Sequence, residues 1–113
     1  MTLTVPAPVE HADPAGERRV DGTVLSIDRF GSLVTNLPPD LARAHAASLR
    51  VEVGGQQIGP LQRTYSDVAP GQLLVLIGSG GRLEIAVREG SAAERLGASR
   101  GVPVRLRTAG GGP

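Results

Sequence analysis

The chain has 113 residues, and its 12 basic and 11 acidic side chains leave a formal net charge of +1 at pH 7. This balance argues against binding to nucleic acids or anionic membranes by bulk electrostatics. The absence of cysteine and lysine excludes thiolate nucleophiles, thiolate metal sites, disulfides and lysine Schiff bases. No apolar run approaches the roughly 20 residues of a membrane helix, and a cysteine-free chain is compatible with the cytoplasm, where we expect it.

The chain reads as one domain between two polar ends. Residues 1–18 are rich in proline and show neither helical nor strand periodicity, which predicts a flexible linker or arm. Residues 108–113 include three consecutive glycines and predict a flexible tail. The folded domain is therefore expected to occupy residues 19–107.

Short runs of β-branched and aliphatic residues follow one another along this domain and predict about six or seven strands. They occupy residues 20–28, 33–36, 49–53, 56–58, 73–77, 82–88 and 102–107. Helical signals are confined to residues 38–47, which open with two prolines, and to residues 91–97, where Ser91 and Glu94 predict a capping box and Gly97 a C-cap. We therefore expect an all-β fold, a small antiparallel β-barrel with one or two short helices.

The motifs for catalysis and for phosphate binding are weak. The two histidines, His11 and His45, have no partner at a metal-ligand spacing, so a histidine metal site, an acid–base pair or a Ser-His-Asp triad is not expected. Residues 78–81 are glycine-rich but lie between two predicted strands, whereas phosphate-binding glycine loops open a helix. They predict a hairpin turn, and the alternative is a loop that lets a small ligand's carboxylate or ring approach the backbone.

Residues 28–36 place a carboxylate, a ring, a hydroxyl and an amide between two apolar strands. One interpretation is a polar bulge in which Phe30 plugs the end of the barrel. The other is a ligand-binding rim, where Asp28 pairs with an ammonium group and Asn36 recognises polar edges. Tyr65 has the same two interpretations, as a second plug or as a stacking surface for a flat ring.

Three segments carry a resemblance to a known family: "GTVLSIDRFGSLVTNL", "RTYSDVAPGQLL" and "IGSGGRLEIAVREGSAAERLG". Over residues 20–107 the chain resembles the C-terminal domain of S-adenosylmethionine (SAM) hydroxide adenosyltransferases, the adenosine-forming SAM hydrolases, which are related to SAM-dependent fluorinase and chlorinase. The resemblance implies a β-barrel that follows an α/β catalytic domain through a proline-containing linker like residues 5–8. It also implies SAM as substrate rather than cofactor, no metal, and a homotrimer for the complete enzyme.

In this family SAM binds between the N-terminal domain of one subunit and the C-terminal domain of its neighbour. Water attacks the ribose C5′ carbon, which releases methionine and leaves adenosine. The residues that handle the water belong to the N-terminal domain, so the resemblance implies no catalytic residue in this chain. It implies binding residues instead: Asp28 for the methionine ammonium, Ser79 and the backbone beside Gly80 for the carboxylate, Tyr65 for the adenine face, Arg88 and Glu89 for the adenine edge, and Phe30 and Asn36 for the rim.

Ser32 and Arg88 depart from the asparagines that are common at their positions in the family. The Ser32 hydroxyl reaches less far than an amide and offers no paired donor and acceptor, which predicts an altered or weaker contact with the nucleoside. Ser32 is still included among the expected binding residues, because it can donate one hydrogen bond.

We expect this chain to be the substrate-binding half of a SAM hydrolase, inactive alone and partnered by the α/β domain in cis or as a separate chain. The alternative is a stand-alone barrel that binds or assembles without catalysis, which Ser32 and the missing domain motivate. A single-strand nucleic-acid binder is disfavoured, because such proteins use aromatic platforms in a basic groove and this chain has two aromatic residues and no basic excess. A membrane partner is not expected.

Overall fold

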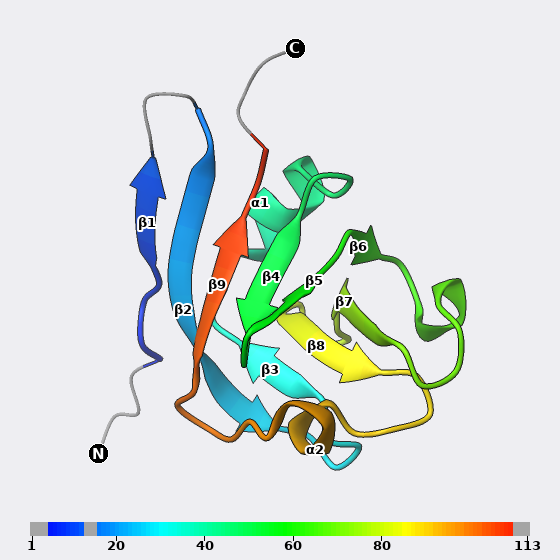
Figure 1. Cartoon of the computed structure of the whole chain (residues 1–113). Helices are drawn as coiled ribbons and strands as arrows, with labels where there is room; N and C mark the ends of the chain where they lie inside the picture. The colour runs from blue at the N-terminus through cyan, green and yellow to red at the C-terminus, as the bar shows by residue number, and fades with distance from the viewer. Residues whose placement is uncertain (1–4, 13–15, 110–113) are drawn as a thin grey trace.

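One sheet of short strands makes up most of the computed structural model, which describes residues 5–12 and 16–109 (Figure 1). Its strands are β1 (Val9–Ala12), β2 (Arg18–Ile27), β3 (Leu33–Thr35), β4 (Arg50–Val53), β5 (Gln56–Ile58), β6 (Leu61–Gln62), β7 (Leu73–Ile77), β8 (Leu83–Val87) and β9 (Pro103–Arg107). Two short α-helices, α1 (Pro39–Ala44) and α2 (Ala92–Leu96), and a 3-10 turn at Tyr65–Asp67 complete the described elements. The all-β prediction is confirmed. No described helix is long and apolar enough to cross a membrane.

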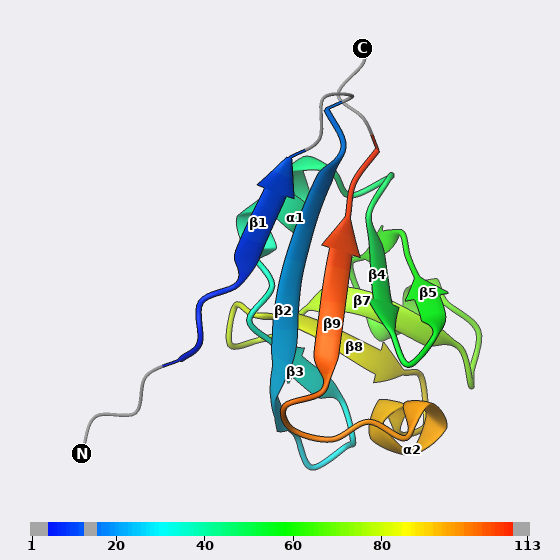
Figure 2. The ribbon, with the colours of Figure 1, turned by 60° about the vertical axis from the view of Figure 1, so that its left-hand side comes forward.

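The sheet is strongly curled, and the long strand β2 bends it. The strand order is β5-β4-β9-β2-β3-β8-β7-β6, with β1 added beside β2, and the neighbours are antiparallel except for β6 and β7. The first half of β2 pairs with β1 and β9, and its second half with β3 (Figure 2). The register shifts between Val24 and Ser26, and such a bulge bends a strand and increases its twist. The β3–β8–β7 part of the sheet therefore turns across the β2–β9–β4 part.

Two of the nine described strands, β1 and β6, are additions to those that the sequence predicts. β1 lies within residues 1–18, for which the sequence predicts a flexible linker. Four residue pairs join it to β2, the first being Val9 with Asp21, so this part of the segment is an edge strand. Residues 1–4 and 13–15 of the predicted linker lie outside the described residues.

The structure also tests the predicted caps of α2 and the predicted C-terminal tail. The Ser91 Oγ accepts a hydrogen bond from the backbone N–H of Glu94 at 3.2 Å, which is one of the two bonds of the predicted capping box, and Gly97 has a left-handed φ of 59°, which confirms the predicted C-cap. In the predicted tail, Thr108 is buried and its N–H donates to the carbonyl of Arg18 at 3.0 Å, so the ladder continues one residue beyond β9. Residues 110–113 lie outside the described part of the chain.

The core is aliphatic. Alternate residues of the strands point inward, as the period of two requires, and the buried cluster consists of Val, Leu, Ile and Ala side chains. Both aromatic side chains lie outside it, because Phe30 is 65% exposed and Tyr65 is 40% exposed. The interpretation of these rings as plugs of a barrel end is therefore wrong.

The segment before β1 is attached to the sheet by Asn36, a buried residue that directly follows β3. The Asn36 Oδ1 accepts a hydrogen bond from the N–H of Thr23 at 2.7 Å, and its Nδ2 donates to the carbonyl of Pro6 at 2.8 Å. Gly22 makes room for this amide, because a Cβ there would overlap with Asn36 Oδ1 and lie 2.8 Å from Leu37 Cδ2. Asn36 therefore joins three segments of the chain that lie far apart in sequence.

Gly22→Ala is expected to lower the free energy of unfolding by about 1–3 kcal/mol, the usual effect of inserting a methyl group into a closely packed site. Gly80→Ala is the matched control, because a Cβ at Gly80 would have no neighbour within 4 Å. It should change stability by less than about 0.5 kcal/mol. Denaturant unfolding of the two variants measures the difference, and equal stabilities would contradict the role given to Gly22.

Candidate binding site

A pocket of about 390 Å³ opens at the C-terminal end of β8. It brings together the β2–β3 loop, the 3-10 turn and the turn after β8. Its lining residues are Phe30, Ser32, Tyr65, Val87, Glu89 and Gly90. Four of the nine predicted site residues, from three separate segments, therefore meet in one place. Val87 and Gly90 complete the lining through the strand end itself, for which the sequence carried no separate signal.

The β2–β3 loop is shaped by Asp28. Its Oδ1 accepts hydrogen bonds from the N–H groups of Phe30 at 2.9 Å and of Ser32 at 3.0 Å. Gly31 has a φ of 84° and lies against Ser91, so a side chain would not fit there. This tight loop projects the Phe30 ring outward, with the Arg29 guanidinium 4.9 Å from the ring centroid. The pocket wall is thus held in place by the backbone rather than by packing of the ring.

Tyr65 is positioned by a separate polar turn. The Asp67 Oδ2 accepts hydrogen bonds from the N–H groups of Arg63 at 2.9 Å and Thr64 at 3.2 Å, which fixes the turn that carries the ring. Further along this segment, the Arg88 guanidinium donates to the carbonyl of Val68 at 2.7 Å. The Arg88 side chain therefore holds the Tyr65 segment against β8, and the expected contact of the Arg88 and Glu89 strand end with the adenine edge stays a prediction.

Glu89 closes the pocket at the end of β8. Its φ is 59°, and it is the one non-glycine residue with a positive φ in the described ranges 5–12 and 16–109. The N–H of Gly90 donates to the carbonyl of Val87 at 3.3 Å, so these residues form a tight turn. A left-handed conformation costs a residue with a side chain about 1–2 kcal/mol. Backbone strain of this kind is typical of functional positions.

Three of the predicted site residues lie elsewhere. Ser79 and Gly80 are exposed in the β7–β8 hairpin, at the other end of β8. The N–H of Gly81 donates to the carbonyl of Gly78 at 2.9 Å, which confirms the predicted hairpin turn. Because β8 has five residues, this turn lies roughly 16 Å from the pocket. The third residue, Asn36, is buried against Thr23 and Pro6 and does not line the pocket.

β8 buries residues on both of its faces. Leu83, Ile85 and Val87 belong to the main core. On the opposite face, Ala86 packs with Leu74 and Leu76, and Val68 of the Tyr65 segment lies against this small cluster. The outer face of β8 is therefore buried around Ala86, beneath the segment that carries Tyr65.

Glu84 lies on the same outer face of β8 and was not among the predicted site residues. It lies opposite Val34 of β3 and Leu76 of β7, and its carboxylate lies so close to Gly78 that a Cβ there would overlap with it. Burial and, secondly, the negative charge of Asp28 raise the pKa of Glu84 above its usual 4.5. The sequence places Glu84 on the outer face, but it does not reveal the contacts with Gly78 and Asp28.

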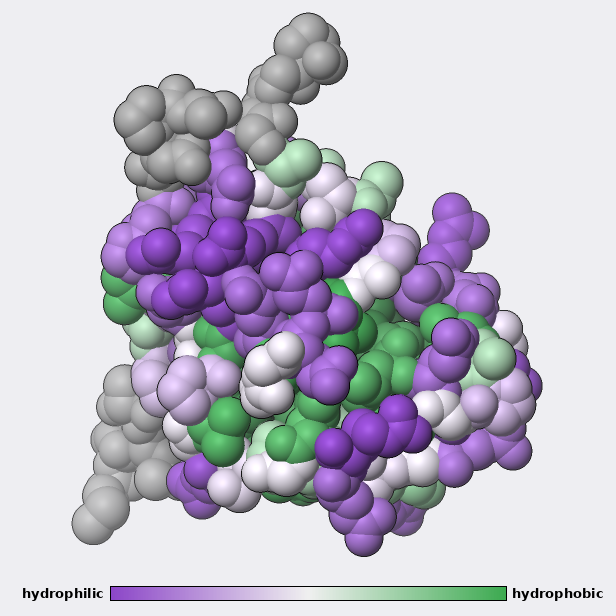
Figure 3. Space-filling view, viewed as in Figure 1, coloured by the Kyte–Doolittle hydropathy of each residue, from purple (hydrophilic) through white to green (hydrophobic). Residues whose placement is uncertain are grey.

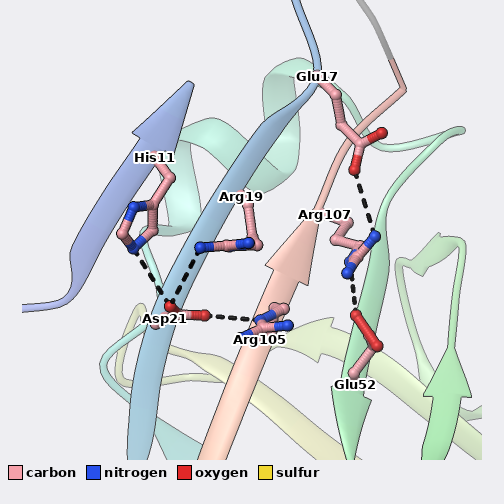
Figure 4. A network of polar contacts seen from close by, with 7 residues as sticks. All are labelled: His11, Glu17, Arg19, Asp21, Glu52, Arg105 and Arg107. Atoms are coloured by element: carbon pink, nitrogen blue, oxygen red, sulfur yellow. Dashed lines mark hydrogen bonds and ion pairs between the residues drawn. The ribbon is translucent and has the colours of Figure 1, made fainter. Parts of the chain in front are cut away.

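A larger hollow of about 720 Å³ lies on a different face, over β2, β9 and the β4–β5 turn. Hydrophilic side chains gather on this side of the molecule (Figure 3). Arg105 Nε lies 2.7 Å from Asp21 Oδ1 and Arg107 Nε lies 2.6 Å from Glu52 Oε1 (Figure 4). The hydrogen bond from Arg105 holds the pKa of Asp21 below its usual 3.8. Its acidic groups are therefore paired with arginine, and none of the predicted site residues lines this hollow.

Comparison with known proteins gives a consistent result. The family model of the SAM hydroxide adenosyltransferase C-terminal domain matches residues 22–105. The (R)-S-adenosyl-L-methionine hydrolases of Thermus thermophilus and Salinispora tropica are 45% identical over 86 residues and 39% identical over 83 residues. These matches cover 76% and 74% of this chain but 31% of each relative, so the chain spans about a third of the curated relatives it matches.

Solved structures also match this fold. The crystal structure of a conserved hypothetical protein from Thermus thermophilus has a TM-score of 0.65 at 44% identity, and the match covers 76% of this chain and 34% of that one. An uncharacterized conserved protein from Thermotoga maritima has a TM-score of 0.74 at 31% identity, and the match covers 94% of this chain and 40% of that one.

Glu84→Gln is expected to raise the free energy of unfolding at neutral pH, by up to about 1 kcal/mol for a partly screened charge. Because the folded state raises the pKa of Glu84 above 4.5, folding is penalised where the carboxyl group is ionised. The gain is therefore present above the raised pKa and disappears as the pH falls to 4.5 and below. Denaturant unfolding across this pH range measures it.

Asp40→Asn provides the control, because Asp40 is an exposed carboxylate on α1 whose side chain is 97% accessible. This variant should change the free energy of unfolding by less than about 0.5 kcal/mol at every pH. A loss of stability in Glu84→Gln at neutral pH would show that the carboxylate is held by a favourable partner instead.

Proposed function

Because the chain belongs to the family of SAM hydroxide adenosyltransferase C-terminal domains, we propose that it is the substrate-binding part of a SAM hydrolase. In this role it holds the adenine and methionine groups of SAM, while the reacting residues belong to an N-terminal α/β domain. That domain is supplied in cis or as a separate chain, and the complete cytoplasmic enzyme is a homotrimer. SAM is the substrate, and water attack at C5′ yields adenosine and methionine.

The observation that carries this proposal is the pocket at the end of β8. Phe30 and Tyr65 are the only two aromatic residues of the chain, and both line this pocket although the core contains none. The exposure of these rings to solvent is unfavourable, because it leaves apolar surface unburied. A flat, partly apolar base that stacks on them would bury that surface, which supports an adenine subsite.

The positions along β8 support a second subsite for the methionine group. The Ser79–Gly80 turn lies at the other end of β8, roughly 16 Å along the strand, whereas Asp28 lies in the loop beside the pocket. This separation suits a nucleoside joined to an amino acid in an extended conformation. Asp28 Oδ1 is occupied by two backbone N–H groups, and its second carboxylate oxygen has no such partner in the described chain, which suits an ammonium group.

A stand-alone binding or assembly module is the second candidate. Ser32 is only 3% exposed, and a buried hydroxyl in place of an amide offers little to a nucleoside. The Arg88 guanidinium is committed to the carbonyl of Val68. Calorimetric titration with SAM and adenosine distinguishes the candidates when it is combined with the two experiments that follow, and an unrelated ligand bound at the same pocket would favour the module.

Mixing the chain with the N-terminal domain of the Thermus thermophilus SAM hydrolase tests the proposed function directly. The mixture should release adenosine and methionine from SAM in equal amounts, measured by chromatography, and this chain alone should release none. A complex that is verified by size-exclusion chromatography and yet forms no adenosine above background would refute the proposal.

Tyr65→Ala should weaken adenosine binding by about 5- to 150-fold, because stacking of a base on an aromatic side chain contributes about 1–3 kcal/mol. Tyr65→Phe keeps the ring and should change the affinity by less than about threefold. The turn itself is held by the Asp67 carboxylate, so both variants should keep the wild-type melting temperature. Equal affinities of the alanine variant and the wild type would exclude Tyr65 from the adenine subsite.

A further inference from the structure

Glu84 lies between the two ends of the proposed site. It lies on the outer face of β8, three residues before Val87, which lines the pocket. In the other direction, its carboxylate lies against Gly78 at the start of the hairpin that carries Ser79. Glu84 is the only polar side chain of β8, and the other four are aliphatic.

The Glu84 carboxylate has no positive partner. Within residues 5–12 and 16–109, no ion pair or side-chain hydrogen bond is made to it, whereas the acidic groups on the β2–β9–β4 face are paired with arginine. The charge that acts on its pKa is that of Asp28, which is also negative. A half-buried carboxylate of this kind is costly unless a cation joins it.

Resting on the proposed function, we propose that Glu84 is a specificity-determining residue whose carboxylate favours a ligand with positive charge at the sulfur position. SAM carries a sulfonium between its nucleoside and its amino acid, which is where Glu84 lies between the two proposed subsites. The neutral thioether S-adenosylhomocysteine has the same adenine, ammonium and carboxylate. The Glu84 carboxylate therefore distinguishes SAM from S-adenosylhomocysteine by the positive charge on the sulfur of SAM.

The expected effect is tighter binding of SAM, with no acceleration of the chemical step. When the C5′–S bond breaks, its electron pair goes to sulfur and the sulfonium becomes a neutral thioether, while the attacking water loses a proton and forms the new C–O bond. The attraction of Glu84 for the sulfonium weakens along this path. An interaction that is stronger in the ground state than in the transition state lowers KM and also lowers kcat, so Glu84 is a binding residue and not a catalytic one.

The test compares two unreactive ligands on the complex with the N-terminal domain. Sinefungin carries a protonated amine at the sulfonium position, and S-adenosylhomocysteine is neutral there. The wild-type complex should bind sinefungin about tenfold more tightly, as expected for one charge pair in a partly solvated site. Glu84→Gln should reduce this ratio to within about threefold, while the Asp40→Asn control should keep it.

The affinity for adenosine shows whether the Glu84 assignment or the proposed function has failed, because adenosine has no group at the sulfonium position. If the wild-type complex binds adenosine but shows no preference for sinefungin, or if Glu84→Gln keeps the preference, the assignment of Glu84 is overturned and the proposed function stands. If the wild-type complex does not bind adenosine, the proposed function fails and the assignment fails with it. Unchanged adenosine affinity in Glu84→Gln shows that the variant is folded.

Discussion

The structure depends on a strand that has to bury both of its faces. β8 lies between β3 and β7, and its alternating side chains enter the main core on one side and a small second cluster on the other. A cover is therefore required over its outer face, and the segment that carries Tyr65 supplies it through Val68. Arg88, at the end of the same strand, ties that cover down. The candidate pocket forms where this cover ends.

An aliphatic core also determines where the aromatic side chains can act. Branched aliphatic residues fill the curled sheet without help from larger rings, because the strands supply them at every second position. Phe30 and Tyr65 are thereby left for the surface, and two polar turns built on Asp28 and Asp67 aim them at one pocket. Each turn satisfies its own backbone N–H groups, so it keeps its shape whether or not a ligand is present.

Sequence patterns predicted the elements that depend on neighbouring residues. They missed the features that depend on contacts between residues far apart in the sequence. The strand 73–77 was predictable from five consecutive apolar residues, the strand 82–88 from alternating apolar residues, and the cap of α2 because its residues are neighbours. β1 was missed, since its four residues are held by backbone pairing with β2 rather than by an apolar pattern. Asn36 could not be separated from the rim residues, because its partner Pro6 lies 30 residues away. The interpretation of Phe30 as a plug was excluded only by the tertiary fold, which leaves the ring 65% exposed.

The left-handed backbone at Glu89 limits how this site can change over evolution. Glycine, asparagine and aspartate tolerate a φ of 59° best, so these three are the accessible replacements at that position. Aspartate would shorten the acidic side chain, asparagine would add a donor beside the acceptor, and glycine would leave only the backbone. Because few residue types fit this turn, the wall of the pocket at position 89 can evolve to contact only a few kinds of polar group. Changes in ligand specificity are therefore expected at the other lining residues.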